Sequence, residues 1–347
     1  MNFQVLFITS GLFLGWSLGA NDAANIFGAA VSSKIIRFRT AAFLMSIFII
    51  IGAVVSGSGA SHTLGKLGAI SKMSGAFIVA LSAAIVVTVM TRKGLPVSTS
   101  QAIVGGIVGW NFFSKQPTQI DVLVKILSTW FLCPFLAALF ALMLHRFFVF
   151  ITRKMKMNLF RRYYYIRLGL LIVGSFGAYS LGANNIGNVM GVFTNAFQFN
   201  SINIFIFTLN STQVLFLLGG IAIAFGVITY SKGVMSTVGN QILKISPPMA
   251  LIVVLASSLV LFLFASQSLK MFLVSYNLPS LPLVPVSSSQ AVVGSVIGIG
   301  LSKGANNINY KKLQKIAMGW VITPIAALVL SYISLFFMQN VFQQIVY

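Results

Sequence analysis

The sequence predicts an all-α polytopic membrane protein built from two halves of inverted topology. Its apolar content, the distribution of its basic residues and an internal repeat support this fold class. Of 347 residues, 58% are hydrophobic and only 7% are charged, whereas a soluble domain carries about 25% charged residues. So few charges cannot cover a soluble surface, and the low hydrophobicity that disorder requires is absent. At about 20 residues for each membrane helix, the length allows about ten crossings.

The charge is strongly unbalanced, with 23 Lys and Arg against two acids, a formal net charge of +21. The basic residues stand between apolar runs, where they set membrane orientation and face anionic headgroups. We therefore expect membrane lipid, and no nucleic acid, as the partner of this charge. Cys133 is the one cysteine and forms no internal disulfide. Residues 1–5 lack the basic region of a cleaved signal peptide and are expected to open the first crossing.

Four short motifs of the first half recur in the same order in the second half. The paired segments are 18–25 and 181–188, 63–65 and 237–239, 96–102 and 285–291, and 130–134 and 320–324. The first pair carries Gly-Ala-Asn and the third carries Pro-Val-Ser, here called the G-A-N and P-V-S motifs. Their offsets grow smoothly from 163 to 190 residues, which indicates a duplicated chain. We expect a first repeat at 1–145, a basic cytoplasmic linker at 146–167 and a second repeat at 168–347.

Basic residues are distributed in opposite ways around equivalent loops. Lys34, Arg37 and Arg39 follow the first G-A-N motif, whereas residues 198–203 after the second carry no charge. After the P-V-S motifs the bias reverses, because one lysine follows the first copy and four follow the second. Equivalent loops are therefore expected on opposite sides of the membrane. Inverted repeats of this kind are a common plan of secondary transporters.

These rules give a path of ten crossings with both termini outside the cytoplasm. The expected crossings are 3–32, 41–57, 75–90, 96–113 and 120–145 in the first half, and 168–197, 205–230, 248–269, 285–302 and 316–340 in the second. Each G-A-N motif places Gly and amides inside an apolar run, and each P-V-S motif begins a short apolar stretch with Pro. We expect broken or re-entrant helices at both motifs, which is where transporters place their sites.

Asp22 is the one acid within a confidently apolar segment, and a carboxylate there costs roughly 2.5–3.5 kcal/mol on insertion scales. Hard cations prefer carboxylate and amide oxygens, so the G-A-N motifs predict a cation site, with Asp22 as the metal ligand if the cation is Na⁺. A structural Asp22, hydrogen-bonded to a helix end, is the alternative. The expected cation-binding residues are Asn21, Asp22, Asn25, Asn184, Asn185 and Asn188. Because Asn185 replaces the carboxylate in the second copy, the two half-sites should differ in cation affinity.

The P-V-S motifs suit an oxyanion, because hydroxyls and amides donate hydrogen bonds and a helix N-terminus adds roughly +0.5 charge. The expected anion-binding residues are Ser98, Thr99, Ser100, Gln101, Ser287, Ser288, Ser289 and Gln290. Simple helix capping is the alternative for these hydroxyls. No nucleotide-binding, metalloprotease or catalytic-triad motif occurs in the sequence, so we expect neither an enzyme nor a cofactor besides a coupling ion.

The duplicated G-A-N and P-V-S motifs, with the T-V-G and W-x₃-P anchors, resemble the inorganic phosphate transporter (PiT) family over roughly residues 10–335. The resemblance implies a symporter of inorganic phosphate, driven by Na⁺ or H⁺, in the cytoplasmic (inner) membrane. It implies that the residues named above bind the ion and phosphate. The short basic segment at 146–167 favours a bacterial, low-affinity permease type. The chain departs from the family pattern at Asn185, where Asp is usual, and at Gln101 and Gln290, where many members carry His.

Other functions stay open at this point. Sulfate or another tetrahedral oxyanion could be the cargo of the same site, and a passive anion channel would need no cation ligand. The coupling ion, the direction of transport and the oligomeric state, a homodimer included, are not determined by the sequence.

Overall fold

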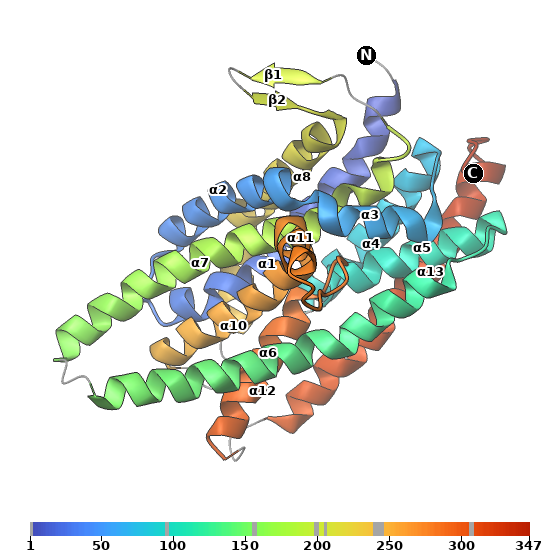
Figure 1. Ribbon diagram of the computed structural model, residues 1–347. Helices are drawn as coiled ribbons and strands as arrows, with labels where there is room; N and C mark the ends of the chain where they lie inside the picture. Colours follow the sequence, from blue (N-terminus) through green and yellow to red (C-terminus); the bar gives the residue numbers. More distant parts are fainter. Residues whose placement is uncertain are drawn as a thin grey trace.

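The computed structural model describes residues 3–93, 97–154, 158–197, 201–204, 207–238, 246–304 and 309–347. Most of them form α-helices that pack into one elongated bundle (Figure 1). A small two-stranded antiparallel sheet accompanies the helices. The predicted all-α fold class is therefore confirmed.

The helices of the first half begin and end close to the predicted crossings. They are η1 (Phe3–Ile8), α1 (Thr9–Ser32), α2 (Phe38–Ser56), α3 (Ser58–Gly68), α4 (Met73–Arg92), α5 (Thr99–Ser114) and α6 (Ile120–Lys154). Helix α3 is short and carries residues 63–65, the first copy of the T-V-G anchor. It lies between two predicted crossings, where the sequence did not predict a helix.

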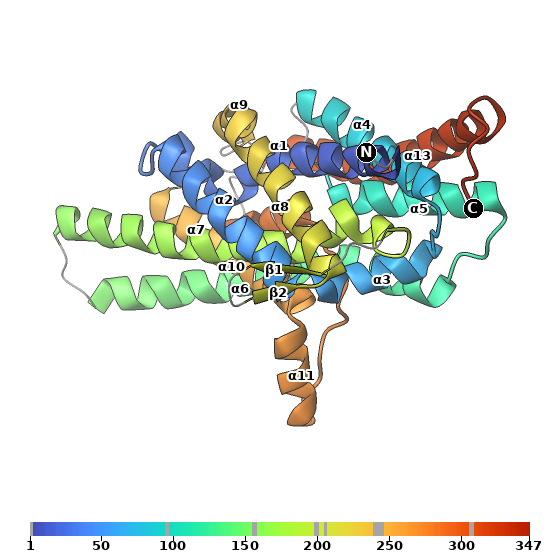
Figure 2. The same ribbon diagram turned by 90° about the horizontal axis from the view of Figure 1, so that it is seen from above.

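The second half repeats this order with additions. Its elements are α7 (Leu159–Met190), η2 (Gly191–Phe193), β1 (Ile202–Ile204), β2 (Phe207–Leu209), α8 (Ser211–Thr229), α9 (Ser231–Val238), α10 (Pro247–Ala265), α11 (Gln267–Ser275), α12 (Ser288–Ser302) and α13 (Tyr310–Asn340). The β1–β2 hairpin and α11 have no counterpart among the described residues of the first half. Figure 2 shows α11 pointing away from the other helices, and none of its residues is buried.

Within the described residues, seven helices are long and apolar enough to cross a membrane: α2, α4, α6, α7 with η2, α8, α10 and α13. Helix α1 has 24 residues, which is enough to cross, but it carries the polar G-A-N motif. Helices α5 and α12 have 16 and 15 residues, which at about 1.5 Å per residue is shorter than a hydrocarbon core of about 30 Å. Both short helices begin inside the protein, as predicted for the P-V-S motifs, although Pro96 lies outside the described residues.

The predicted break at the G-A-N motifs is wrong, because α1 and α7 are continuous α-helices through residues 18–25 and 181–188. One glycine in a helix costs only about 1 kcal/mol relative to alanine, which packing can offset. A Cβ at Gly19 would overlap the backbone oxygen of Ile223, and one at Gly182 would overlap that of Ile49. These glycines therefore allow two helices to approach closely and do not unwind them.

Most of the segment predicted as a basic linker is helical, because α6 continues to Lys154 and α7 begins at Leu159. The sequence from 146 to 154 contains neither Gly nor Pro, so nothing in it ends a helix. The 35 residues of α6 span about 52 Å, well beyond a hydrocarbon core of about 30 Å. Figure 1 shows the end of α6 and the start of α7 projecting from the same end of the bundle.

Helices of the two halves pack on each other in matched pairs. Helix α1 packs on α8 and α2 packs on α7, while α5 packs on α13 and α12 packs on α6. Glycines at these contacts also occupy matched positions in the two halves. A Cβ at Gly105 would overlap the backbone of Pro324, and one at Gly294 would overlap that of Pro134. Small residues at matched positions are how membrane helices approach closely. The pairing supports a duplicated chain, and the opposite orientation of the two halves stays a prediction.

Candidate functional site

The four motifs with predicted binding residues meet in the interior of the bundle. Helices α1 and α7 carry the G-A-N motifs, and the N-termini of α5 and α12 carry the P-V-S motifs. All fourteen predicted site residues are buried, and none is more than 7% exposed. Side chains that lie far apart in the sequence are thus brought into one polar cluster.

Within each half, a G-A-N asparagine binds the backbone just before the short helix. The Asn21 amide Nδ2 donates to the carbonyl oxygen of Val97 at 3.3 Å. The equivalent Asn184 Nδ2 donates to the carbonyl oxygen of Val286 at 2.7 Å, and Asn184 Oδ1 accepts from the Val286 N–H at 3.1 Å. These bonds fix where α5 and α12 begin.

Between the halves, the last asparagine of each motif reaches the opposite short helix. Asn25 Nδ2 donates to the hydroxyl of Ser288 at 3.2 Å, and Asn188 Nδ2 donates to the hydroxyl of Ser100 at 2.8 Å. The Ser100 hydroxyl in turn donates to the carbonyl oxygen of Val286 at 3.2 Å. The N-termini of α5 and α12 therefore lie next to each other.

The carboxylate of Asp22 is only partly satisfied by the protein. Its Oδ1 accepts from Asn21 Nδ2 at 3.1 Å and from Asn25 Nδ2 at 3.4 Å. Its Oδ2 is buried and has no hydrogen-bond partner among the described residues. Because a buried acceptor without a partner costs about 1–3 kcal/mol or more, this oxygen is suited to a cation or a proton.

The equivalent Asn185 is engaged differently. Its Oδ1 accepts from Asn188 Nδ2 at 2.9 Å, and its own Nδ2 donates to the carbonyl oxygen of Leu181 at 3.2 Å. Both ends of the amide are therefore hydrogen-bonded within α7. The neutral amide also has no negative charge to attract a cation. Within the second G-A-N motif, the buried Asn188 Oδ1 has no partner in the described part of the chain.

Two of the predicted anion-binding hydroxyls cap helices. Ser98 Oγ accepts from the Gln101 N–H, and Ser287 Oγ accepts from the Gln290 N–H, each at 3.2 Å. The capping alternative thus describes Ser98 and Ser287. The residues after each cap keep first-turn N–H groups that have no acceptor within their own helix, and these groups give the helix N-terminus its partial positive charge.

Further buried acceptors surround these helix starts. Thr99 Oγ1, Gln101 Oε1 and Gln290 Oε1 are buried with no hydrogen-bond partner among the residues that the structure describes. The Ser287 and Ser289 hydroxyls lie 3.0 Å apart and share one hydrogen bond. Free N–H donors, rotatable hydroxyls and unpaired acceptors together fit a partly protonated oxyanion, which both accepts and donates hydrogen bonds.

Sequence reasoning missed the backbone carbonyls of Val97 and Val286, which anchor the asparagines and organise the site. An apolar side chain gives no sign of such a role. The available signal was position, because each valine immediately precedes an N-cap serine, where the backbone is extended. Buried Cys133, whose Sγ lies 3.6 Å from the carbonyl oxygen of Ser287, also borders the site.

The chain is similar to known transport proteins. The chain matches the Phosphate transporter family over residues 18–331 and 280–345. The "Putative phosphate permease MJ0630" of Methanocaldococcus jannaschii is 29% identical over 92% of this chain and 93% of its own length. The "Sulfate permease CysP" of Bacillus subtilis is 26% identical over 94% of this chain and 85% of its own length.

A solved structure titled "The sodium-dependent phosphate transporter" has the same fold, with a TM-score of 0.78 and 21% identity. The alignment covers 98% of this chain and 99% of that one. Since the family match spans nearly the whole sequence and the motifs that suggested it meet in one buried cluster, the chain belongs to the phosphate transporter family.

Proposed function

We propose that the protein is a secondary active transporter that moves inorganic phosphate across the cytoplasmic membrane together with Na⁺ or H⁺. One observation carries the proposal: a buried carboxylate oxygen that has no partner among the described residues lies in the same hydrogen-bonded cluster as two adjoining helix N-termini. The first group suits a cation or proton and the second suits an oxyanion. A site with both properties can bind both solutes at once.

Asn25 provides a direct link between the two binding functions. Its amide contacts Asp22 Oδ1 at 3.4 Å and the Ser288 hydroxyl at 3.2 Å. An anion bound near Ser288 is repelled by an unneutralised Asp22, since like charges in a medium of low dielectric interact strongly. A cation or proton on Asp22 removes that repulsion and therefore raises the affinity for phosphate. Such mutual dependence is what couples an anion to a cation gradient.

The acceptor atoms favour phosphate over sulfate. Gln101 Oε1 and Gln290 Oε1 are buried without partners in the described residues, and they need a donor from the ligand. Near neutral pH phosphate carries one or two P–OH groups, whereas sulfate carries none, and a site that pairs with a hydroxyl strongly rejects an analogue lacking it. The similarity to the sulfate permease of Bacillus subtilis makes sulfate the second candidate cargo.

The burial of the site favours a transporter over a passive channel. A channel requires a continuous wet path, whereas the predicted binding residues are at most 7% exposed. A closed site between two packed halves suits a carrier that opens first to one side and then to the other. The unpaired oxygen of Asp22 also has no evident use in a channel for anions.

Uptake of radiolabelled phosphate into proteoliposomes tests the proposal, with Na⁺ and pH gradients imposed separately. We expect accumulation above equilibrium with one of the gradients and weaker competition by sulfate than by unlabelled phosphate. The variant Asn25→Ala, which removes the amide between Asp22 and Ser288, should weaken the dependence of phosphate binding on the cation. Phosphate flux that only equilibrates, in either gradient, would reject the symport mechanism, and stronger competition by sulfate would reassign the cargo.

A further inference from the structure

A pocket with several basic side chains in its lining lies at the far end of α12 from the proposed transport site. It has a volume of about 350 Å³, within the range of roughly 300–1,000 Å³ that is typical of ligand sites. Its lining residues are His145, Arg146, Val149, Phe150, Arg153, Lys154 and Ser302. Ser302 ends α12 and Ser288 begins it, so the pocket lies about 21 Å along the helix from the anion-binding motif.

The pocket concentrates positive charge that the protein itself leaves unbalanced. Arg146, Arg153 and Lys154 line it, and none of the described residues that line it is acidic. The whole sequence contains two acids, Asp22 and Asp121. Asp121 lies in the first turn of α6, about 37 Å along the helix from Arg146. The described part of the protein therefore supplies no carboxylate to pair with these three cations, which leaves them available to an external anion.

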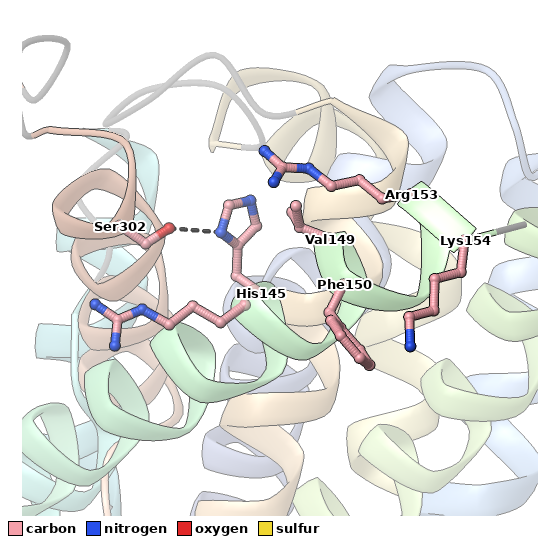
Figure 3. A pocket seen from close by; sticks show the side chains of 7 residues that line it. His145, Val149, Phe150, Arg153, Lys154 and Ser302 are labelled. Atoms are coloured by element: carbon pink, nitrogen blue, oxygen red, sulfur yellow. Dashed lines mark hydrogen bonds between the residues drawn. The ribbon is translucent and has the colours of Figure 1, made fainter.

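The pocket is shaped by contacts that hold its walls in place. The Ser302 hydroxyl and His145 Nδ1 lie 2.5 Å apart and join α12 to α6. Lys154 Nζ lies 4.3 Å from the centre of the Phe150 ring, a cation–π contact that restrains the ammonium group. Figure 3 shows His145 bonded to Ser302 and the Arg153 side chain extending toward the imidazole ring of His145.

An apolar stripe runs along α6 directly beside the basic pocket. Met143, Phe147 and Phe150 are 57–61% exposed, and their spacing of four and three residues places them on one face of the helix. These side chains suit the hydrocarbon of a bilayer, and the basic residues of the last turns suit its headgroup layer. A ligand with a phosphate at one end and an acyl chain at the other matches both features.

We propose that this pocket binds the phosphate group of an anionic phospholipid, whose acyl chain lies along Met143, Phe147 and Phe150. Arginine guanidinium groups form charge-assisted hydrogen bonds with phosphate oxygens. Basic pockets between membrane helices hold anionic headgroups by the same chemistry. Free inorganic phosphate carries the charge but lacks the chain, so the two sources of phosphate can be told apart.

The test measures binding of short-chain phosphatidylglycerol to the purified full-length protein in detergent, by microscale thermophoresis. Short-chain phosphatidylcholine and inorganic phosphate serve as comparison ligands. Arg146→Gln with Arg153→Gln should weaken phosphatidylglycerol binding by about tenfold or more, because the double variant removes two guanidinium groups that form charge-assisted hydrogen bonds with phosphate. The control is Lys311→Gln with Lys312→Gln, which removes two exposed charges at the start of α13 without touching the pocket.

The possible outcomes distinguish a lipid site from general surface attraction and from a site for free phosphate. Preference for phosphatidylglycerol over phosphatidylcholine, lost in the arginine variant and kept in the lysine control, supports the lipid site. Equal loss in both double variants would show general surface attraction and overturn it. Binding of inorganic phosphate that depends on Arg146 and Arg153 and is not displaced by phosphatidylglycerol would reassign the pocket to free phosphate. Phosphate uptake in phosphatidylcholine liposomes checks that the arginine variant is folded, because these arginines lie outside the transport site.

Discussion

Asp22 and Asn185 occupy equivalent positions in the two G-A-N motifs, but their side chains differ in hydrogen bonding. The carboxylate has one buried oxygen without a partner in the part of the chain that the structure describes, while both ends of the amide are hydrogen-bonded within α7. An amide can complete hydrogen bonds that a carboxylate cannot, since it both donates and accepts. Because Asp22 carries a negative charge and Asn185 does not, we expect the coupling cation or proton to bind in the first half of the molecule.

We expect Asp22→Asn to abolish gradient-driven phosphate uptake while the protein stays folded. A unit charge about 4 Å from a cation contributes roughly 4 kcal/mol at an effective dielectric constant of about 20, so cation affinity should fall by about a hundredfold or more. Uptake in proteoliposomes and elution on size-exclusion chromatography measure the two effects. Normal concentrative uptake by this variant would make Asp22 a structural residue.

Asn185→Asp provides the converse experiment at the matching position. A second carboxylate should strengthen the dependence of uptake on the coupling cation and weaken phosphate affinity, because like charges repel. The steepness of uptake against cation concentration and the half-saturating phosphate concentration report these two effects. A variant with unchanged cation dependence would show that the second G-A-N motif does not take part in coupling.

Much of the site could be predicted from residue types alone. Repeated Asn, Ser and Thr side chains cost free energy to bury in apolar surroundings unless they form hydrogen bonds or bind a ligand. All fourteen predicted residues lie in one cluster. The sequence could not reveal that Asn25 contacts Ser288 while Asn188 contacts Ser100, because such bonds depend on how α1 and α7 face the opposite short helices.

At the scale of elements, we expect the hydroxyls at the starts of α5 and α12 to divide between helix capping and anion binding. Ser98 and Ser287 cap their helices, whereas buried Thr99 Oγ1 has no partner in the described part of the chain. Ser98→Ala should lower stability by about 1 kcal/mol, as for a lost N-cap, with a smaller effect on phosphate affinity. Thr99→Val, which keeps the shape, should weaken affinity and spare stability. Thermal unfolding and uptake kinetics of both variants test this division.

The glycines of the G-A-N motifs act at the same scale through helix packing. Gly182→Ala should destabilise the protein by about 1–3 kcal/mol, because the added methyl group overlaps the α2 backbone and overpacking has costs of this size. Gly319→Ala in α13 is the matched control, since a Cβ there meets nothing within 4 Å. Thermal unfolding in detergent compares the two variants. Equal melting temperatures would show that α2 and α7 can separate without loss of stability.

The same glycines explain why the expected helix breaks are absent. From the sequence, Gly19 and its neighbouring amides read as an interruption of an apolar run, and nothing local distinguishes a break from a close helix crossing. The distinction depends on Ile223 of α8, more than 200 residues away in the sequence. The P-V-S motifs were predictable because Pro and N-cap serines act on the adjacent residues themselves.

At the scale of the whole molecule, the predicted inverted orientation is open to direct measurement. In a Cys133→Ser background, Lys34→Cys and Asn158→Cys should react with an impermeant thiol reagent only after the membrane is opened. Gln116→Cys and Ser201→Cys should react in intact cells. All four positions are exposed. Labelling of positions 34 and 201 from the same side would reject the inverted topology, because these positions follow the two G-A-N helices.

The packing of α1 on α8 and of α5 on α13 has a consequence for how the protein is made. Ser288, which receives the hydrogen bond of Asn25, is synthesised 263 residues later. At about 5–20 residues per second on the ribosome, this separation corresponds to roughly 13–50 s. During that time α1 with Asp22 has been synthesised, while α12, which carries Ser288 and one of the two P-V-S motifs, has not. The first half must therefore persist as an inserted but unfinished intermediate until the last short helix arrives.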